Sequence, residues 1–156
     1  MNIRFTLTII GIFFLISISK THANPTGKSV SCHSTLKENL NYKNYKGISF
    51  ETEKSVRVVT LKMKNNKLKV VSKLTPYKIK KNNIYFKIKF IWYGNIFFEE
   101  FNLNRDNLDL INTSKNQVRQ LKCKVINGDF MAEMNMNKEK YQSMFQQGIG
   151  EKINSF

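Results

Sequence analysis

The sequence predicts a mainly β domain: a small antiparallel meander, curled into an up-and-down β-barrel, closed by one disulfide and followed by a C-terminal helix. Short runs of β-branched and aromatic residues recur between turn residues along most of the chain. The two best runs lie between Ile84 and Arg105 and flank Gly94-Asn95, which suits a two-residue hairpin turn. Cys32 and Cys123, the only cysteines, would join the first strand to the last, as barrel closure requires.

Residues 1–23 are expected to be a signal peptide that is removed before the domain folds. Arg4 precedes a mostly apolar, uncharged run over residues 5–18, and Thr21-His22-Ala23 has the small residues that a signal peptidase accepts. The run is shorter than the ~20 residues of a membrane-spanning helix, and Asn24, not cysteine, follows the expected cleavage point. We therefore expect a secreted protein, in the periplasm or outside the cell, without a stable membrane anchor.

The chain is strongly basic, with 26 Lys and Arg against 11 Asp and Glu and a net charge of +15. The leader would remove two of the 26 basic residues and leave +13. From Lys54 to Phe98 there are twelve basic residues and no acidic one. Such a field favours an anionic surface, a polyanion or an acidic protein patch as partner. Nucleic acid fits poorly, because an exported, disulfide-bonded chain rarely meets it.

Two cysteines in an exported chain indicate a Cys32–Cys123 disulfide, and unpaired buried thiols are the alternative. The first strand is expected over residues 29–34, after a flexible lead-in. Thr35 to Glu38 fits a capping box and a short helix, and residues 48–52 a second strand.

Residues 55–64 alternate as a strand should, and residues 68–74 return after Asn65-Asn66, a pair that tolerates the positive φ of a tight turn. Pro76 then interrupts, so that residues 77–81 are expected to be an edge strand or a connection. The hairpin aligns like charges, either as a solvated face or as a surface kept positive for a partner. The opposed residues are Lys62 with Lys69 and Lys64 with Lys67.

A turn at Gly94-Asn95 sets the register of the next hairpin, with Tyr93 opposite Ile96 and Lys89 opposite Glu100. One face is then nearly apolar apart from Glu99. Its residues are Phe86, Ile88, Phe90, Trp92, Phe97, Phe101 and Leu103.

Glu99 is interpreted either as a mouth position open to water or a bulge that turns it outward, or as a polar group inside a ligand-holding barrel. Arg57 and Arg105 are its candidate partners.

The last strands are expected over residues 108–111 and 117–126. Asp129 can cap a helix that covers the barrel mouth and ends at Gly148, leaving residues 149–156 as a flexible tail. Its apolar face is expected to carry Phe130, Met134, Tyr141 and Phe145. Residues 24–148 thus form one β-rich domain, helical from about residue 129.

No catalytic residue, metal ligand set or cofactor is expected. His33 is the only histidine after residue 23, and it neighbours Cys32, which tempts a nucleophile interpretation. Adjacent strand residues point to opposite faces, however, and an oxidised cysteine is no nucleophile. One histidine and two bridged cysteines are also too few ligands for a metal site. We expect a protein that is not an enzyme.

Phe101-Asn-Leu-Asn-Arg105 and the later Leu121-Lys-Cys-Lys124 resemble segments of small exported proteins of alphaproteobacteria, which commonly have Thr-Gly where this chain has Asp106-Asn107. The leader, the small size and the missing enzyme motif resemble those of Sec-delivered effectors of insect-vectored, phloem-dwelling bacteria. That resemblance implies a virulence role and a host-protein partner, with papain-like cysteine proteases as the candidate target of inhibition. The Gln-x-Val-x-Gly hairpin of cystatins is absent, since Arg119-Gln120 follows Gln117-Val118.

The sequence therefore predicts a secreted effector that binds a host protein. The expected contact residues are the hairpin tip (Trp92, Tyr93, Gly94 and Asn95) and the basic strands (Lys62, Lys64, Lys67, Lys69, Lys87 and Lys89). The alternative is a periplasmic barrel that holds a small apolar or anionic ligand between Trp92, Phe90 and Glu99. An enzyme that uses Glu99 and a polyanion or envelope-surface binder are two further alternatives.

Overall fold

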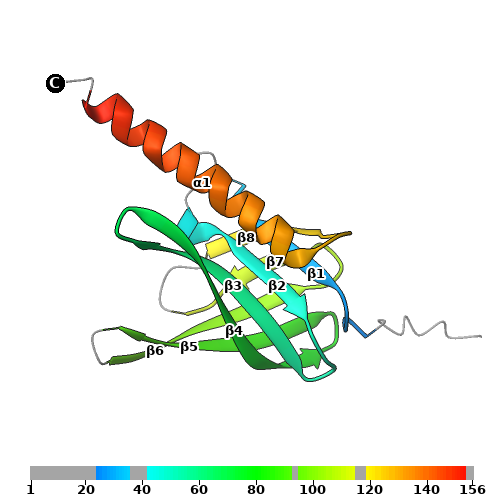
Figure 1. The fold of residues 1–156 in the computed structure, drawn as a ribbon. Helices are drawn as coiled ribbons and strands as arrows, with labels where there is room; N and C mark the ends of the chain where they lie inside the picture. The colour runs from blue at the N-terminus through cyan, green and yellow to red at the C-terminus, as the bar shows by residue number, and fades with distance from the viewer. Residues whose placement is uncertain (1–23, 36–41, 93–94, 115–118, 154–156) are drawn as a thin grey trace, which may run out of the picture.

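A computed structural model describes residues 24–35, 42–92, 95–114 and 119–153. Within these residues eight antiparallel strands pair in chain order and close into a barrel, and one long helix follows (Figure 1). The predicted fold class is confirmed. The strands are β1 (Ser29–His33), β2 (Lys46–Phe50), β3 (Ser55–Lys64), β4 (Lys67–Lys80), β5 (Asn83–Trp92), β6 (Asn95–Asn104), β7 (Asp109–Asn112) and β8 (Arg119–Val125). The helices are the 3-10 turn η2 (Tyr42–Asn44) and α1 (Phe130–Ile153).

The barrel is closed by pairing of β1 with β8, and the predicted disulfide lies at this closure. Cys32 and Cys123 are directly opposed in the β1–β8 ladder and are bonded to each other across 91 positions of sequence. Backbone pairing and the covalent bond therefore join the same two strands.

The β3–β4 hairpin has the predicted turn and register. Asn65 and Asn66 both adopt left-handed conformations, with φ of 52° and 57°, as a two-residue primed turn requires. The expected lysine pairs, Lys62 with Lys69 and Lys64 with Lys67, stand directly opposite one another.

The prediction that Pro76 interrupts the chain is wrong, because β4 runs through it without a break. Proline cannot donate to a ladder and is usually excluded from central strands. Here Pro76 is the last residue to pair with β3, and pairing with β5 begins one residue later, at Tyr77. The missing N–H falls where β4 passes from one neighbour to the other.

The predicted register of the β5–β6 hairpin is wrong by two residues. Ile96 lies opposite Ile91, not Tyr93, and the ladder ends at Trp92 with Asn95. Asn95, which was expected in the turn, therefore belongs to β6, and Tyr93 and Gly94 lie outside the described residues. The observed register stacks Phe86 on Phe101, with ring centroids 5.2 Å apart.

A shift of two residues keeps every side chain on its predicted face, because the strand period is two. It does change the charge pair. Glu100 faces Lys87, at 2.7 Å between Nζ and Oε1, and Lys89 faces Phe98.

Two apolar clusters share the strand β3. Val56 and Val58 point into the barrel, where the larger cluster lies, whereas Val59 and Leu61 point outward and pack with Met134 of α1. The helix therefore lies against the outer wall of the barrel (Figure 1), and the prediction that it covers the mouth is wrong. The outward-facing apolar residues of β3 form a surface on which α1 can bury its own apolar side chains.

The start of α1 is as predicted and its end is not. Asp129 Oδ1 accepts hydrogen bonds from the backbone N–H groups of Met131 and Ala132, at 2.7 and 3.1 Å, which satisfies the helix N-terminus. The helix continues past Gly148 to Ile153, because glycine weakens a helix without necessarily ending it. No helix in the described part of the chain is long and apolar enough to span a membrane.

Two predictions fall on residues that the structure does not describe. The signal peptide over residues 1–23 and the short helix beginning at Thr35 lie almost wholly outside the described ranges. Both stay predictions.

Candidate functional site

The interior of the barrel changes from apolar to cationic along its length. Alternation in β2 turns Lys46, Ile48 and Phe50 inward in succession, and Ile48 and Phe50 belong to the interior apolar cluster. β3 runs antiparallel to β2, and its inward series begins at Val56, opposite Phe50. It passes Thr60, opposite Lys46, and reaches Lys62 at the cationic end. One end of the barrel is thus a packed core, and the other end is lined by lysines.

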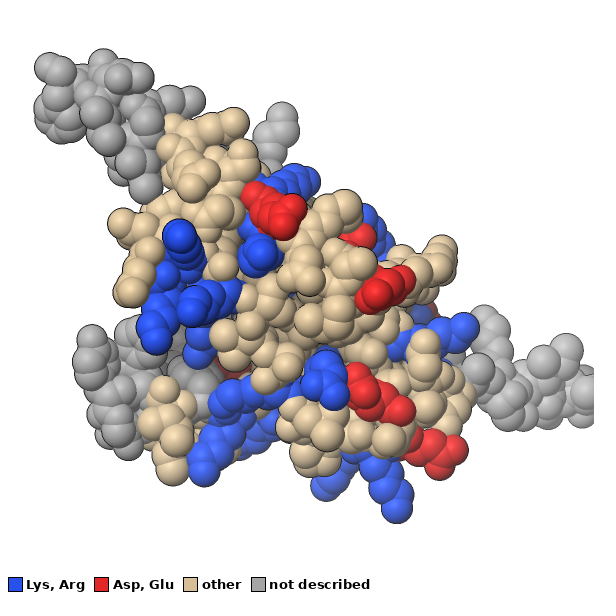
Figure 2. All heavy atoms as spheres, in the orientation of Figure 1, with Lys and Arg blue, Asp and Glu red and all other residues tan. Residues whose placement is uncertain are grey.

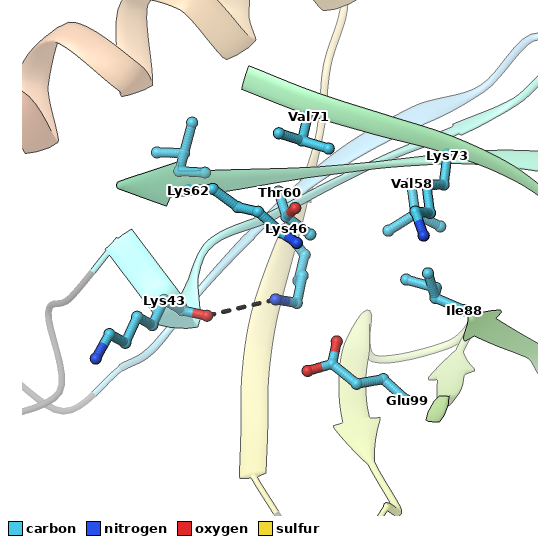
Figure 3. A pocket seen from close by; sticks show the side chains of 10 residues that line it. Lys43, Lys46, Val58, Thr60, Lys62, Val71, Lys73, Ile88 and Glu99 are labelled. Carbon is cyan, nitrogen blue, oxygen red and sulfur yellow. Dashed lines mark hydrogen bonds between the residues drawn. The ribbon is translucent and has the colours of Figure 1, made fainter. Parts of the chain in front are cut away.

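A cavity of about 310 Å³ occupies the cationic end (Figure 3). It lies at the lower end of the size range of small-molecule sites, roughly 300–1,000 Å³. Four lysines and one carboxylate supply its charges, and aliphatic side chains supply most of the remainder. Its described lining residues are Lys43, Lys46, Val58, Thr60, Leu61, Lys62, Val71, Lys73, Ile88 and Glu99.

Lys46 is the most unusual residue of this site, because it is only 8% exposed. Its neighbours in the barrel wall are Cys32 on β1 and Thr60 on β3. Its Nζ donates a hydrogen bond to the Lys43 carbonyl of η2 at 3.4 Å. Burying an ammonium group has a large desolvation cost, so lysine is rarely found inside a fold unless an anion compensates it. An anion bound beside Lys46 would offset part of this cost.

Glu99 is the one acidic residue among the described lining residues of the cavity. It is half-buried, lies opposite Ile88 in the β5–β6 ladder, and points toward the space that Lys46 faces, whereas the ammonium group of Lys43 is directed away (Figure 3). Glu99 thus faces inward at the open, cationic end of the barrel, which agrees with the expected mouth position and also makes it a polar group that lines a cavity. Arg57, one of the expected partners of Glu99, pairs instead with Glu51, at 2.7 Å between Nε and Oε1.

A smaller cavity of about 30 Å³ shares Lys43, Lys46 and Glu99 with the main one. Leu110 and Leu121 are among its other lining residues, so it extends the site toward β7 and β8. The mixed carboxylate and ammonium groups thus stand at the junction of two hollows.

The structure divides the predicted contact residues into separate groups. Lys62 lines the cavity, and Lys64, Lys67 and Lys69 share its face of the β3–β4 hairpin, so that they continue the cationic surface away from the mouth. Lys87 and Lys89 lie on the outer face of β5 and are not part of this site. Tyr93 and Gly94 lie outside the described residues, as do the side chains of Phe90, Trp92 and Asn95, so the ligand position expected between Trp92, Phe90 and Glu99 is described only at Glu99.

Three lysines of the cavity were not expected from the sequence: Lys43, Lys46 and Lys73. The alternation of Lys46, Ile48 and Phe50 carried a usable signal, but the second strand was expected to begin only at Ile48. No sequence signal placed Lys43 and Lys73 at the cavity, because their positions beside it depend on how the barrel closes.

His33 lies under α1, on the opposite face of β1 from Cys32. Its Nδ1 is 3.3 Å from the Tyr141 hydroxyl and its Nε2 is 3.4 Å from the Ser31 hydroxyl, and its ring packs on Tyr45. Burial lowers the pKa of His33, and the nearby cations Lys124 and Lys140 lower it further, whereas Glu133 opposes the shift. His33 belongs to the helix interface and not to the cavity.

The lowered pKa of His33 predicts that the domain loses stability as the pH falls through the ordinary pKa of histidine, about 6.5. Above that pH the ring is neutral in both states, and the stability is fully present. Below it the unfolded chain binds a proton that the folded chain resists, so unfolding becomes easier. Urea unfolding at pH 7.5, 6.5 and 5.5 measures the effect.

His33→Gln is the matched control, because it keeps a polar side chain of similar size and cannot titrate. Its stability should stay flat over the same pH range. A pH dependence that persists unchanged in His33→Gln would contradict the assignment of the effect to this ring.

Comparison with known proteins adds no functional assignment: no protein family, curated protein or solved structure matches this chain. Among the described residues, no group of three or more His, Cys, Asp or Glu side chains could hold a metal ion.

Proposed function

We propose that this protein is a non-enzymatic binding protein whose barrel mouth takes a small organic anion with an apolar body. The observation that carries the proposal is the inward-facing, 8%-exposed Lys46 at the wall of a 310 Å³ cavity. Eight-stranded barrels are of the size at which the interior either fills with side chains or holds one small ligand. Here the apolar end is filled, and the cationic end is not.

The charges of the cavity favour an acidic ligand. Lys43 directs its ammonium group away (Figure 3), but Lys46, Lys62 and Lys73 still outnumber the single carboxylate of Glu99, so an incoming anion meets an excess of positive charge in a partly desolvated space. The lysine-bearing face of the β3–β4 hairpin continues from the mouth and would raise the local concentration of anions there.

The remaining lining favours a ligand that also has an apolar part. Val58, Val71 and Ile88 contribute aliphatic surface beside the lysines. A ligand with a carboxylate, phosphate or sulfate at one end and a short hydrocarbon body would match both halves of the lining. A fully hydrated inorganic ion would leave the aliphatic half unused.

The host-protein partner, the virulence role and the inhibition of papain-like cysteine proteases stay predictions from the sequence. Their expected contact residues at the hairpin tip, Trp92 to Asn95, have side chains outside the described part of the chain. Binding of a small anion is compatible both with a secreted effector and with a periplasmic binding protein.

The test uses 8-anilinonaphthalene-1-sulfonate as a fluorescent probe of the folded protein, displaced by decanoate or by decanol. Decanoate should displace the probe at least tenfold more effectively than the uncharged alcohol. Lys46→Met should weaken decanoate binding by about tenfold or more, because hydrogen bonds to charged groups contribute about 1.5–3 kcal/mol. Glu99→Gln should tighten it, because the competing carboxylate is gone.

Lys124→Met serves as the control, since Lys124 is exposed on β8 and lies outside the described cavity lining. Its decanoate affinity should equal that of the unaltered protein. Equal displacement by acid and alcohol, or Lys46→Met and Glu99→Gln shifts in the same direction, would overturn the proposal.

A further inference from the structure

The outer face of the β5–β6 hairpin carries exposed apolar side chains at the end farthest from the packed core. Ile91 is 63% exposed, Ile96 is 53% exposed and Phe98 is 47% exposed. Ile91 and Ile96 are directly opposed, and Phe98 lies two residues further from the turn, on the same face. Large apolar side chains that gather on one surface commonly mark an interaction site. In Figure 1 the two strands extend from the barrel as a narrow ribbon.

Cationic side chains stand directly behind this apolar end, on the same face. Lys89 is opposed to Phe98, and Lys87 is two residues further along β5, with its Nζ 4.4 Å from the centre of the Phe98 ring. Glu100 pairs with Lys87 and offsets part of its charge. The order from the free end inward is therefore apolar, then cationic, then a mixed pair.

The spacing of these layers matches a bilayer interface. Successive strand residues rise about 3.4 Å, so the Ile91–Ile96 pair lies roughly 7 Å beyond Lys89 and Phe98 and roughly 14 Å beyond Lys87 and Glu100. Apolar groups of peripheral proteins enter the boundary between headgroups and acyl chains to a depth of about 5–10 Å. Lysines placed that far back reach the headgroup phosphates with their amines.

The charge of the surrounding surface points to anionic lipid. Residues 54–98 carry twelve basic and no acidic residues. Figure 2 shows blue basic side chains gathered on the left and lower parts of the molecule, with most red acidic ones toward the right. Each basic residue held near an anionic bilayer adds to the attraction.

We propose that the β5–β6 hairpin docks the barrel reversibly on anionic membranes. Ile91, Ile96 and Phe98 enter the boundary region, and Lys87 and Lys89 contact lipid phosphates. Three apolar side chains on a narrow ribbon are few for a stable protein interface, which needs about 800 Å² from each partner, whereas a bilayer accepts a narrow wedge. The proposal is independent of the cavity, because this face points away from the barrel interior.

The test is co-sedimentation of the purified chain from residue 24 onward with vesicles of phosphatidylcholine, with and without 30% phosphatidylglycerol. The unaltered protein should sediment with the anionic vesicles and bind neutral ones at least tenfold more weakly. The double variant Ile96→Ser/Phe98→Ser should lose binding to anionic vesicles by at least tenfold. Circular dichroism checks that it remains folded.

The matched control is Met136→Ser/Met144→Ser, which removes two exposed apolar side chains from α1. Its binding should equal that of the unaltered protein. The proposal is overturned if the hairpin and helix variants bind alike, or if the unaltered protein ignores anionic vesicles. In the second case the exposed face would be assigned to a protein partner.

Discussion

Removing the Cys32–Cys123 disulfide is expected to lower the free energy of unfolding by about 4–5 kcal/mol in the chain-entropy account. The bond spans 91 positions, so breaking it opens a large loop and raises the conformational entropy of the unfolded chain. A domain of this size is stable by only about 5–15 kcal/mol in total. The loss would therefore remove about a quarter or more of the total stability of the domain.

Urea unfolding of the Cys32→Ala/Cys123→Ala variant measures this effect. The two cysteines are buried, so alanine also leaves a small void, and the unaltered protein unfolded in the presence of dithiothreitol provides the comparison without one. Both should lose several kcal/mol. A loss below about 1 kcal/mol in the reduced protein would contradict the account, and would mean that β1–β8 pairing alone holds the barrel closed.

Gly47→Ala is expected to destabilise the domain by about 2 kcal/mol, because it overpacks the interface between the barrel and α1. A Cβ at Gly47 would collide with Met134 Sδ and stand 3.3 Å from Phe130 Cε2. Met134 is fully buried, and its sulfur accepts a hydrogen bond from the Tyr45 hydroxyl at 3.0 Å, so it has little freedom to withdraw. Thermal unfolding followed by circular dichroism measures the loss.

Gly128→Ala provides the matched control, since a Cβ there meets nothing within 4 Å. It should change stability by less than about 0.5 kcal/mol. The cost of Gly47→Ala should also shrink in a Met134→Ala background, because the added methyl then has room. A cost that is the same in both backgrounds would show that it arises from the backbone of β2 and not from the contact with α1.

The faces of the strands could be predicted from the sequence more reliably than their registers. Alternation placed Phe86, Ile88, Phe101 and Leu103 on one side, and all four are buried in the barrel. The partner of each residue depended on where the turn falls, and Gly94-Asn95 favoured a turn one residue too late. Asn65-Asn66 left no such choice, because both residues tolerate positive φ.

The position of α1 could not be predicted from the helix sequence alone, because it depends on the outer face of β3. Its apolar residues showed that the helix packs on something, but not on what. The clue lay in β3, where Val56 and Val58 alternate with Val59 and Leu61, so that both faces are apolar. A strand with two apolar faces in a single-sheet barrel must be covered from outside as well as from inside.

The candidate site was only partly predictable for a related reason. Glu99 was recognised, because a carboxylate in an apolar series stands out in a sequence. Lys46 stands at the start of a short strand in a lysine-rich region, where the local sequence does not distinguish a buried lysine from exposed ones. Its burial follows from barrel closure, which brings β2, β3 and β6 around one cavity.

Native mass spectrometry of the protein purified from its producing cells tests the proposal of an anion-binding barrel most directly. We expect the unaltered protein to retain a small molecule that carries an acidic group. The Lys46→Met variant, purified in parallel, should lack this bound molecule. Identification of the extra mass would name the ligand class at once. Two proteins that both appear only at the mass of the bare chain, and that fail to take up decanoate when it is added, would contradict the account.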